Sequence, residues 1–152
     1  MNKKDQIVAG IIASTHIMAL GAPFCYTPQA FQLCFWGYMI TALGITASFH
    51  RQLTHKSFKS PKWVERLLAT WGTLAVQGHP IEWCSNHRHH HVHCDTEVDP
   101  HSPYDGLWWS HMGWLFDSKA QIILFDTSNV KDLKRDDYYQ WLKKNYLWVT
   151  IG

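Results

Sequence analysis

The chain has 152 residues, a length typical of one compact domain, and its 14 basic and 12 acidic residues give a formal net charge of only +2. This balance argues against a nucleic-acid-binding protein, which would be expected to carry a basic patch. Four cysteines without a CxxC pair argue against a disulfide scaffold. The unusual feature of the composition is the abundance of histidine and tryptophan, with 11 and 9 residues.

The N-terminal part of the chain has no charged side chain over residues 6–50, a stretch of 45 residues. A membrane-spanning helix needs about 20 apolar residues, so this stretch can hold two spans, which we place at about residues 7–21 and 31–49. Pro23 and Pro28 lie between them, where a helix must end because proline cannot continue it. The sequence therefore predicts a transmembrane helical hairpin.

Basic residues flank this hairpin (about residues 7–49) on both sides, with Lys3 and Lys4 before it and Arg51 directly after it. Basic residues favour the cytoplasmic side of a membrane or its organellar equivalent. We therefore expect both ends of the hairpin, and the polar region that follows, to lie on that side.

Small residues recur in the second predicted span, at Gly37, Thr41, Gly44 and Ser48. Such a stripe lets membrane helices approach closely, and we interpret it as a packing face in preference to a substrate groove. In the first span, we interpret His16 as a neutral, hydrogen-bonded side chain in preference to a functional one.

Two histidine patterns follow the second predicted span. His50 and His55 form an HxxxxH sequence, and His87, His90 and His91 form HxxHH. The last three share one face of an α-helix, but residues five apart point about 140° away from each other. His50 and His55 therefore converge only if the helix unwinds or ends between them. Five imidazoles exceed the needs of one tetrahedral metal ion, so we favour two metals, or a site completed elsewhere, over a solvated histidine-rich loop.

The segments that contain these histidines resemble the membrane-bound fatty acyl desaturases. The resemblance rests on HRQLTH at residues 50–55, on WCSNHRHHH at 83–91, and on the run from DPHS at 99–102 to SHMGWLF at 110–116. It covers nearly the whole chain, and it is nearest to the Δ9-type acyl-lipid and acyl-CoA desaturases of plants, algae and cyanobacteria. His79 departs from the family pattern, because many relatives have an acidic residue or glycine there.

The resemblance implies a di-iron centre that uses O₂ and two electrons to introduce a double bond into an acyl chain, since no protein side chain can oxidise an alkyl C–H bond. The implied iron ligands are His50, His55, His87, His90 and His91, whereas His89 falls at a variable position. The implied partners are an acyl-CoA or acyl-lipid substrate, O₂, and an external electron donor, either ferredoxin or cytochrome b5. The implied location is the endoplasmic reticulum or a plastid membrane.

Several neighbouring residues are candidates for supporting roles. Asp95, Glu97 and Asp99 follow the second histidine box, where a carboxylate can accept the free N–H of a ligating imidazole. A solvated acidic loop is an equal alternative for each of them. Trp83, His101 and His111 resemble family positions close to the substrate or with a structural role.

The rest of the chain is also expected to be helical, so the predicted fold is all-α: a membrane hairpin plus a cytosol- or stroma-facing helical region that carries the histidine boxes (about residues 50–117). Residues 126–145 predict a helix, with Ser128 or Asn129 as its N-cap. Residues 146–152 resemble the start of a third span.

Complete family members carry a third histidine box near the C-terminus, whereas no histidine follows His111 in this sequence. We therefore expect residues 1–152 to form one partial desaturase domain that is inactive on its own. Two alternatives stay open. One is a lipid hydroxylase or ketolase of the same di-iron superfamily, which shares HxxHH, and the other is a non-catalytic, truncated membrane protein.

Overall fold

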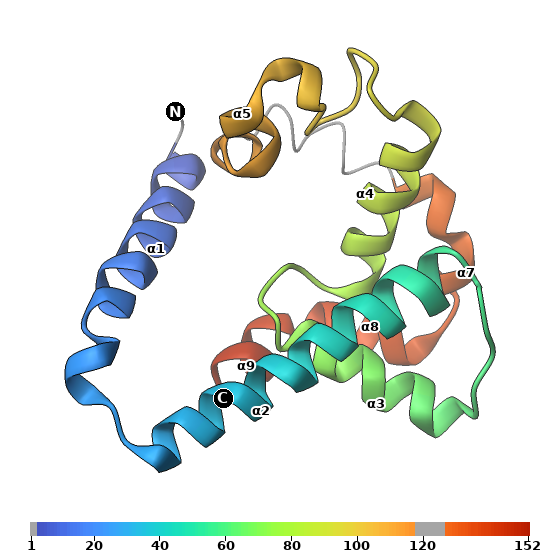
Figure 1. Ribbon diagram of the computed structural model, residues 1–152. Coiled ribbons are helices and arrows are strands. Elements are labelled where there is room, and N and C mark those ends of the chain that lie inside the picture. Colours follow the sequence, from blue (N-terminus) through green and yellow to red (C-terminus); the bar gives the residue numbers. More distant parts are fainter. Residues whose placement is uncertain (1–2, 118–126) are drawn as a thin grey trace.

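The computed structural model describes residues 3–117 and 127–152 (Figure 1). Within these ranges the chain forms helices and contains no strand, so the prediction of an all-α fold is confirmed. The elements in chain order are α1 (Lys3–Leu20), η1 (Ala22–Cys25), α2 (Pro28–Leu43), η2 (Gly44–Thr54), α3 (Lys62–Thr73), α4 (Pro80–His93), η3 (Pro103–Asp105), α5 (Leu107–His111), η4 (Gly113–Phe116), η6 (Thr127–Val130), α7 (Lys131–Lys134), α8 (Asp137–Lys144) and α9 (Tyr146–Ile151).

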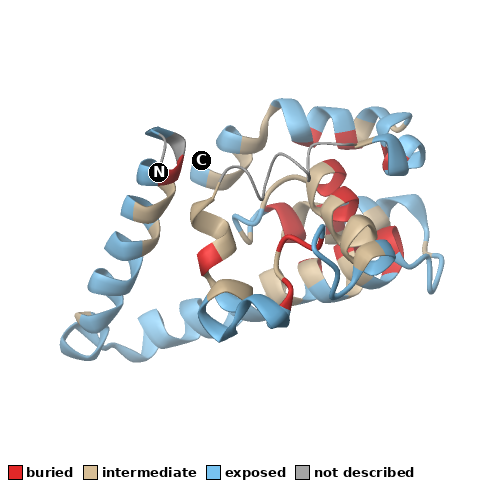
Figure 2. Cartoon of the chain, turned by 90° about the horizontal axis from the view of Figure 1, so that it is seen from above, coloured by how far each residue is buried: buried red, intermediate tan, exposed pale blue. Residues whose placement is uncertain are grey.

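One helix in the described part of the chain is long and apolar enough to cross a membrane. It is the continuous helix Pro28–Thr54, which consists of α2 and η2. Helix α1 is apolar over Asp5–Leu20 but is shorter. Most side chains of both helices are exposed (Figure 2), a pattern that fits an apolar surface facing lipid. Within α1, the ring of His16 donates a hydrogen bond to the carbonyl oxygen of Ile12 at 2.8 Å, so this side chain has a hydrogen-bond partner, as expected.

Helices α1 and α2 diverge from the turn that joins them instead of packing along each other (Figure 1). Helix α1 contacts η4, whereas α2 and η2 pack against α3. A Cβ atom on Gly44 would overlap the backbone of Trp71 and Gly72, so only glycine permits this approach. Gly44 therefore belongs to a helix-packing face, as expected, whereas nothing lies within 4 Å of the Cβ position of Gly37.

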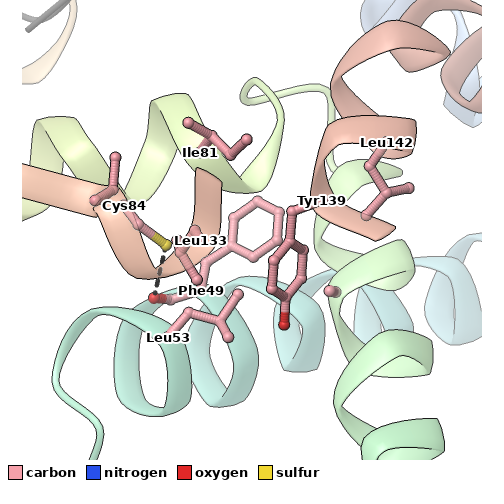
Figure 3. Packing of buried hydrophobic residues seen from close by; sticks show 9 residues of the cluster. Phe49, Leu53, Ile81, Cys84, Leu133, Tyr139 and Leu142 are labelled. Carbon is pink, nitrogen blue, oxygen red and sulfur yellow. Dashed lines mark hydrogen bonds between the residues drawn. The ribbon is translucent and has the colours of Figure 1, made fainter. Parts of the chain in front are cut away.

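The hydrophobic core lies where η2, α3, α4, α7 and α8 meet (Figure 3). Phe49 at its centre is fully buried, as are Cys84 on α4 and Leu142 on α8. The remaining members are Leu53, Ala69, Ile81, Val130, Leu133 and Tyr139. This core fixes η2 against α4, and these are the two elements that carry the histidine patterns.

The predicted helix over residues 126–145 is divided in the structure into η6, α7 and α8; residue 126 itself lies outside the described residues. Helix α8 has its own N-cap, because the side chain of Asp136 accepts a hydrogen bond from the amide of Tyr138 at 2.9 Å. Neither predicted N-cap begins a long helix. The side chain of Asn129 instead pairs with Ser85 of α4, which attaches this segment to the helix that carries the second box.

Candidate metal centre

His50 lies in a π-helix, η2, and His55 is its C-cap; in a π-helix each amide bonds to the carbonyl five residues earlier. The amide of His55 donates to the carbonyl oxygen of His50 at 3.1 Å. Residues five apart are thus one turn apart, and the two imidazole rings face each other with centroids 4.7 Å apart. The predicted condition for convergence, a departure from regular α-helix, is met by this wider winding.

The second histidine pattern lies on α4, which has Pro80 as its first residue and His79 as its N-cap. The rings of His87 and His91, four residues apart, have centroids separated by 4.6 Å. Their Nε2 atoms lie 3.1 Å apart. Two neutral imidazole nitrogens at this distance either share a proton or, with both lone pairs inward, face a bound cation.

Four histidines from the two helices converge on one point. Ring centroids are separated by 4.8 Å between His50 and His87 and by 4.6 Å between His55 and His91. One ligand nitrogen from each of the four rings lies within 4.8 Å of all the others. We call His50, His55, His87 and His91 the four-histidine cluster; its donor set suits iron or another imidazole-binding transition metal.

The environment keeps His87 and His91 in the protonation state that metal binding requires. Burial, reinforced by the neighbouring imidazoles of His91, His50, His55 and His90, lowers the pKa of His87 to about 3. The pKa of His91 is lowered by the same causes. Both rings are therefore neutral at physiological pH, and neutral imidazole is the form that binds metal.

His90 has a different environment from the other box histidines. Its Nδ1 lies 3.0 Å from both carboxylate oxygens of Asp99, a side chain with no exposed surface. The amides of Asp95 and His101 also donate to that carboxylate. Burial raises the pKa of Asp99, but these amides and His90 outweigh burial and hold the pKa below its usual range. The centroid of His90 lies 6.0 Å from that of His87, beside the cluster.

The other candidate residues divide into near and far positions. Trp83 packs against His87, with ring centroids 4.9 Å apart. His101 packs against His90, with ring centroids 4.3 Å apart. Asp95 and Glu97 are exposed. Among the described contacts, Asp95 contacts Asp99 only through its backbone amide, which donates to the carboxylate. His111 is exposed at the end of α5, and no described ring contact joins it to the cluster.

Sequence reasoning missed the role of Arg88, which lies between His87 and His90 in the second box. Its guanidinium donates to the carbonyl oxygens of Leu53 at 2.6 Å and Asn129 at 2.7 Å. It also forms a two-point ion pair with Asp132, at 2.9 and 3.0 Å. Arg88 therefore ties together η2, α4 and the C-terminal segment. The only signal in the sequence was an arginine among ligands, which by itself indicates no partner.

A cavity of about 510 Å³ lies beside the cluster. His55 and His91 of the cluster line it, together with Arg88, His89 and His93. The remaining lining residues are Thr54, Val92 and Asn129. The cluster is thus accessible from this side.

Comparison with known proteins covers the region that contains both histidine patterns. Residues 10–151 match the family model described as fatty acid desaturase. This chain belongs to the fatty acid desaturase family. The predicted family resemblance is therefore confirmed, and the histidine boxes lie within the matched region of this desaturase-family chain.

Three relatives illustrate the similarity of this desaturase-family chain to curated proteins. The palmitoyl-monogalactosyldiacylglycerol delta-7 desaturase, chloroplastic, of Arabidopsis thaliana is 46% identical over 139 residues, or 90% of this chain and 38% of the relative. The Delta-9 acyl-lipid desaturase 2 of the same plant is 48% identical, over 91% of this chain and 46% of the relative. The sn-1 stearoyl-lipid 9-desaturase of Anabaena variabilis is 45% identical, over 88% of this chain and 51% of the relative. The chain spans about half or less of the length of these relatives.

Proposed function

We propose that this chain is part of an oxidoreductase that introduces a double bond into an acyl chain carried by a lipid or by CoA. The observation that carries the proposal is the convergence of four imidazoles at the end of an apolar helix long enough to cross a membrane. The names of the relatives, which describe acyl-lipid and acyl-CoA desaturases, support the substrate class. In this proposal O₂ and two electrons from ferredoxin or cytochrome b5 are consumed.

In this proposal the four-histidine cluster and His90 hold iron. The donor set fits, because the four imidazoles of the cluster offer ring nitrogens within 4.8 Å of one another, and imidazole is a suitable iron ligand. Bound iron would supply the oxidising power for an alkyl C–H bond, which no side chain has. The protein's part is to keep His87 and His91 neutral by lowering their pKa values, and to hold the imidazoles beside the membrane. Five imidazoles do not fill two iron coordination spheres, so we expect the 152-residue chain alone to bind fewer than two irons.

Among the three candidate carboxylates, we propose a supporting role for Asp99. A carbonyl or carboxylate acceptor at one imidazole nitrogen fixes the tautomer and aims the other nitrogen at the metal. With its Nδ1–H donated to Asp99, His90 keeps the lone pair on Nε2 for a metal. Asp95 and Glu97 are exposed and are left with the solvated-loop role.

The substrate side of the proposal rests on position. His50 lies in the last turn of the apolar helix Pro28–Thr54, so an acyl chain in the membrane would reach the centre from the lipid-facing surface of α2. Trp83, packed on His87, is the candidate for contact with that chain. His101 contacts His90 and is assigned a positioning role, and His111 stays a weaker substrate-proximal candidate. We propose the endoplasmic reticulum or a plastid membrane as the location; two of the relatives are named as chloroplastic.

The test is iron content and lipid product of the chain purified in detergent. Wild type should bind iron, and His55→Ala and His91→Ala should lose it, whereas the exposed control His111→Ala should keep it. Equal iron in all four proteins would contradict the metal site. In a host with acyl lipids, mass analysis of the product of the whole enzyme of which this chain is part separates the alternatives: desaturation removes two hydrogens, hydroxylation adds one oxygen, and a non-catalytic protein changes neither. For the 152-residue chain alone we expect no product.

A further inference from the structure

Two histidines of α4 lie outside the four-histidine cluster and form a pair of their own. His89 and His93 are four residues apart on the helix, and their ring centroids lie 4.5 Å apart, with an interplanar angle of 41°. Side chains with this spacing are neighbours on one helix face. Two histidines at i and i+4 can bind one metal ion between them, as in helical zinc motifs.

The hydrogen bonding of His89 leaves a nitrogen for a metal. Its Nε2 lies 3.3 Å from the carbonyl oxygen of Val98. A carbonyl only accepts hydrogen bonds, so Nε2 carries the proton and the lone pair is on Nδ1. A carbonyl partner at one ring nitrogen is the usual way to fix the tautomer of a metal-binding histidine. For His93, no described hydrogen bond occupies either ring nitrogen.

The pair shares a cavity with the four-histidine cluster. His89 and His93 line the same space of about 510 Å³ as His55 and His91. A metal ion held by the pair would therefore be separated from the cluster by this space and not by packed side chains. Two phenylalanine rings would make the same ring contact. What histidine adds at these two positions is a nitrogen atom that can bind a metal.

We propose that His89 and His93 form a second, exchangeable site for a divalent transition metal, from which the four-histidine cluster is loaded. Two imidazoles leave the other coordination positions to water, so this site binds more weakly than a cluster of four imidazoles. The site itself is independent of the proposed desaturase function; its role in loading rests on that function.

The first test is a zinc titration of the full 152-residue chain in which binding is measured by calorimetry. Wild type should show a tight and a weak class of site. His89→Phe and His93→Phe keep a ring at each position and remove the donors, so both should lose the weak class and keep the tight one. His111→Phe is the matched control and should keep both. An unchanged weak class in both variants overturns the proposal.

Two further arms keep this result separate from the proposed function. The double variant His55→Ala/His91→Ala should lose the tight class and keep the weak one; loss of only the tight class is the signature of two distinct sites. His93→Gln, a polar and smaller replacement, repeats the test in case the phenylalanine variants fail to fold.

The loading role is tested by the rate at which cobalt(II), added below stoichiometry, reaches the cluster, as followed by its visible absorption. His93→Phe should slow this rate and leave the final spectrum unchanged. An unchanged rate overturns the loading role.

Discussion

The amide of His55 donates a hydrogen bond to the carbonyl oxygen of His50, so the two ends of the HxxxxH sequence are one helical turn apart. In a regular α-helix the same residues would diverge by about 140°. The π-helix therefore brings the first histidine box to a single point. Its winding is supported by Thr54, whose hydroxyl donates to the carbonyl oxygen of Phe49 at 2.8 Å, five residues back.

The start of this π-helix gives the first prediction. Gly44 touches the backbone of α3 at Gly72, so Gly44→Ala should push α2 away from α3. We expect it to destabilise the chain by about 2 kcal/mol or more, in the range found for overpacked cores, and to reduce iron binding. Thermal unfolding in detergent and iron analysis measure both effects.

The matched control for Gly44 is Gly37, which lies about two helical turns earlier in the same stripe. Nothing lies within 4 Å of its Cβ position, so Gly37→Ala should leave both stability and iron content near those of wild type. Equal effects at the two positions would show that the contact between α2 and α3 does not set the geometry of the centre.

The second prediction concerns Asp99. In Asp99→Asn, an uncharged amide replaces the buried carboxylate that now accepts from His90 and two backbone amides. Loss of such a partner typically weakens metal binding about 10- to 100-fold, and we expect this range in a competition titration with a chelator. Glu97→Gln, an exposed neighbour, should bind metal as wild type does; a normal affinity in Asp99→Asn would refute the role of the carboxylate.

The third prediction concerns Arg88. Arg88→Met removes the ion pair with Asp132 and leaves the carbonyl of Leu53 without its donor. Because the pair is only partly buried, with 16% and 37% of the two side chains exposed, we expect a loss of about 2 kcal/mol, below the range for fully buried pairs. Arg88→Lys keeps the positive charge but not the planar guanidinium that binds a carboxylate at two points. This variant should recover part of the lost stability. Stability to denaturant measures the series, and full recovery of wild-type stability in Arg88→Lys would argue against a role for the two-point geometry.

The sequence was sufficient for the all-α fold, which depends on local periodicity, and the family resemblance of its motifs was sufficient to predict that the histidines of the two boxes come together. The sequence was not sufficient for the contacts that cross between elements. The pairing of Arg88 with Leu53 and Asp132, and the different environment of His90, depend on how η2, α4 and the C-terminal segment pack. The divergence of α1 from α2 likewise depends on α2 packing against α3, which no local pattern specifies.

The fourth prediction is a loss of stability in acid that depends on His79. Its Nδ1 caps α4 by accepting a hydrogen bond from the amide of Glu82 at 3.3 Å. Burial, with a contribution from Lys143, lowers the pKa of His79 to about 4, and outweighs the carboxylate of Glu82 that lies 3.6 Å from Nε2. An unfolded histidine has a pKa of about 6.5. Between these values the unfolded chain binds a proton at this position and the folded chain does not.

The free energy of unfolding should therefore be at its full value above about pH 6.5 and fall as the pH drops toward 4, with His79 contributing roughly 3 kcal/mol of the change. His79→Asn supplies a good N-cap that does not titrate. The unfolding free energy of His79→Asn should fall less steeply over the same pH range. Some dependence on pH should remain, because other partly buried histidines, such as His87, also have lowered pKa values. Denaturant titrations of both proteins at a series of pH values measure the difference. Parallel curves would mean that His79 has the same pKa in the folded and unfolded chains, and that the cap does not depend on its lone pair.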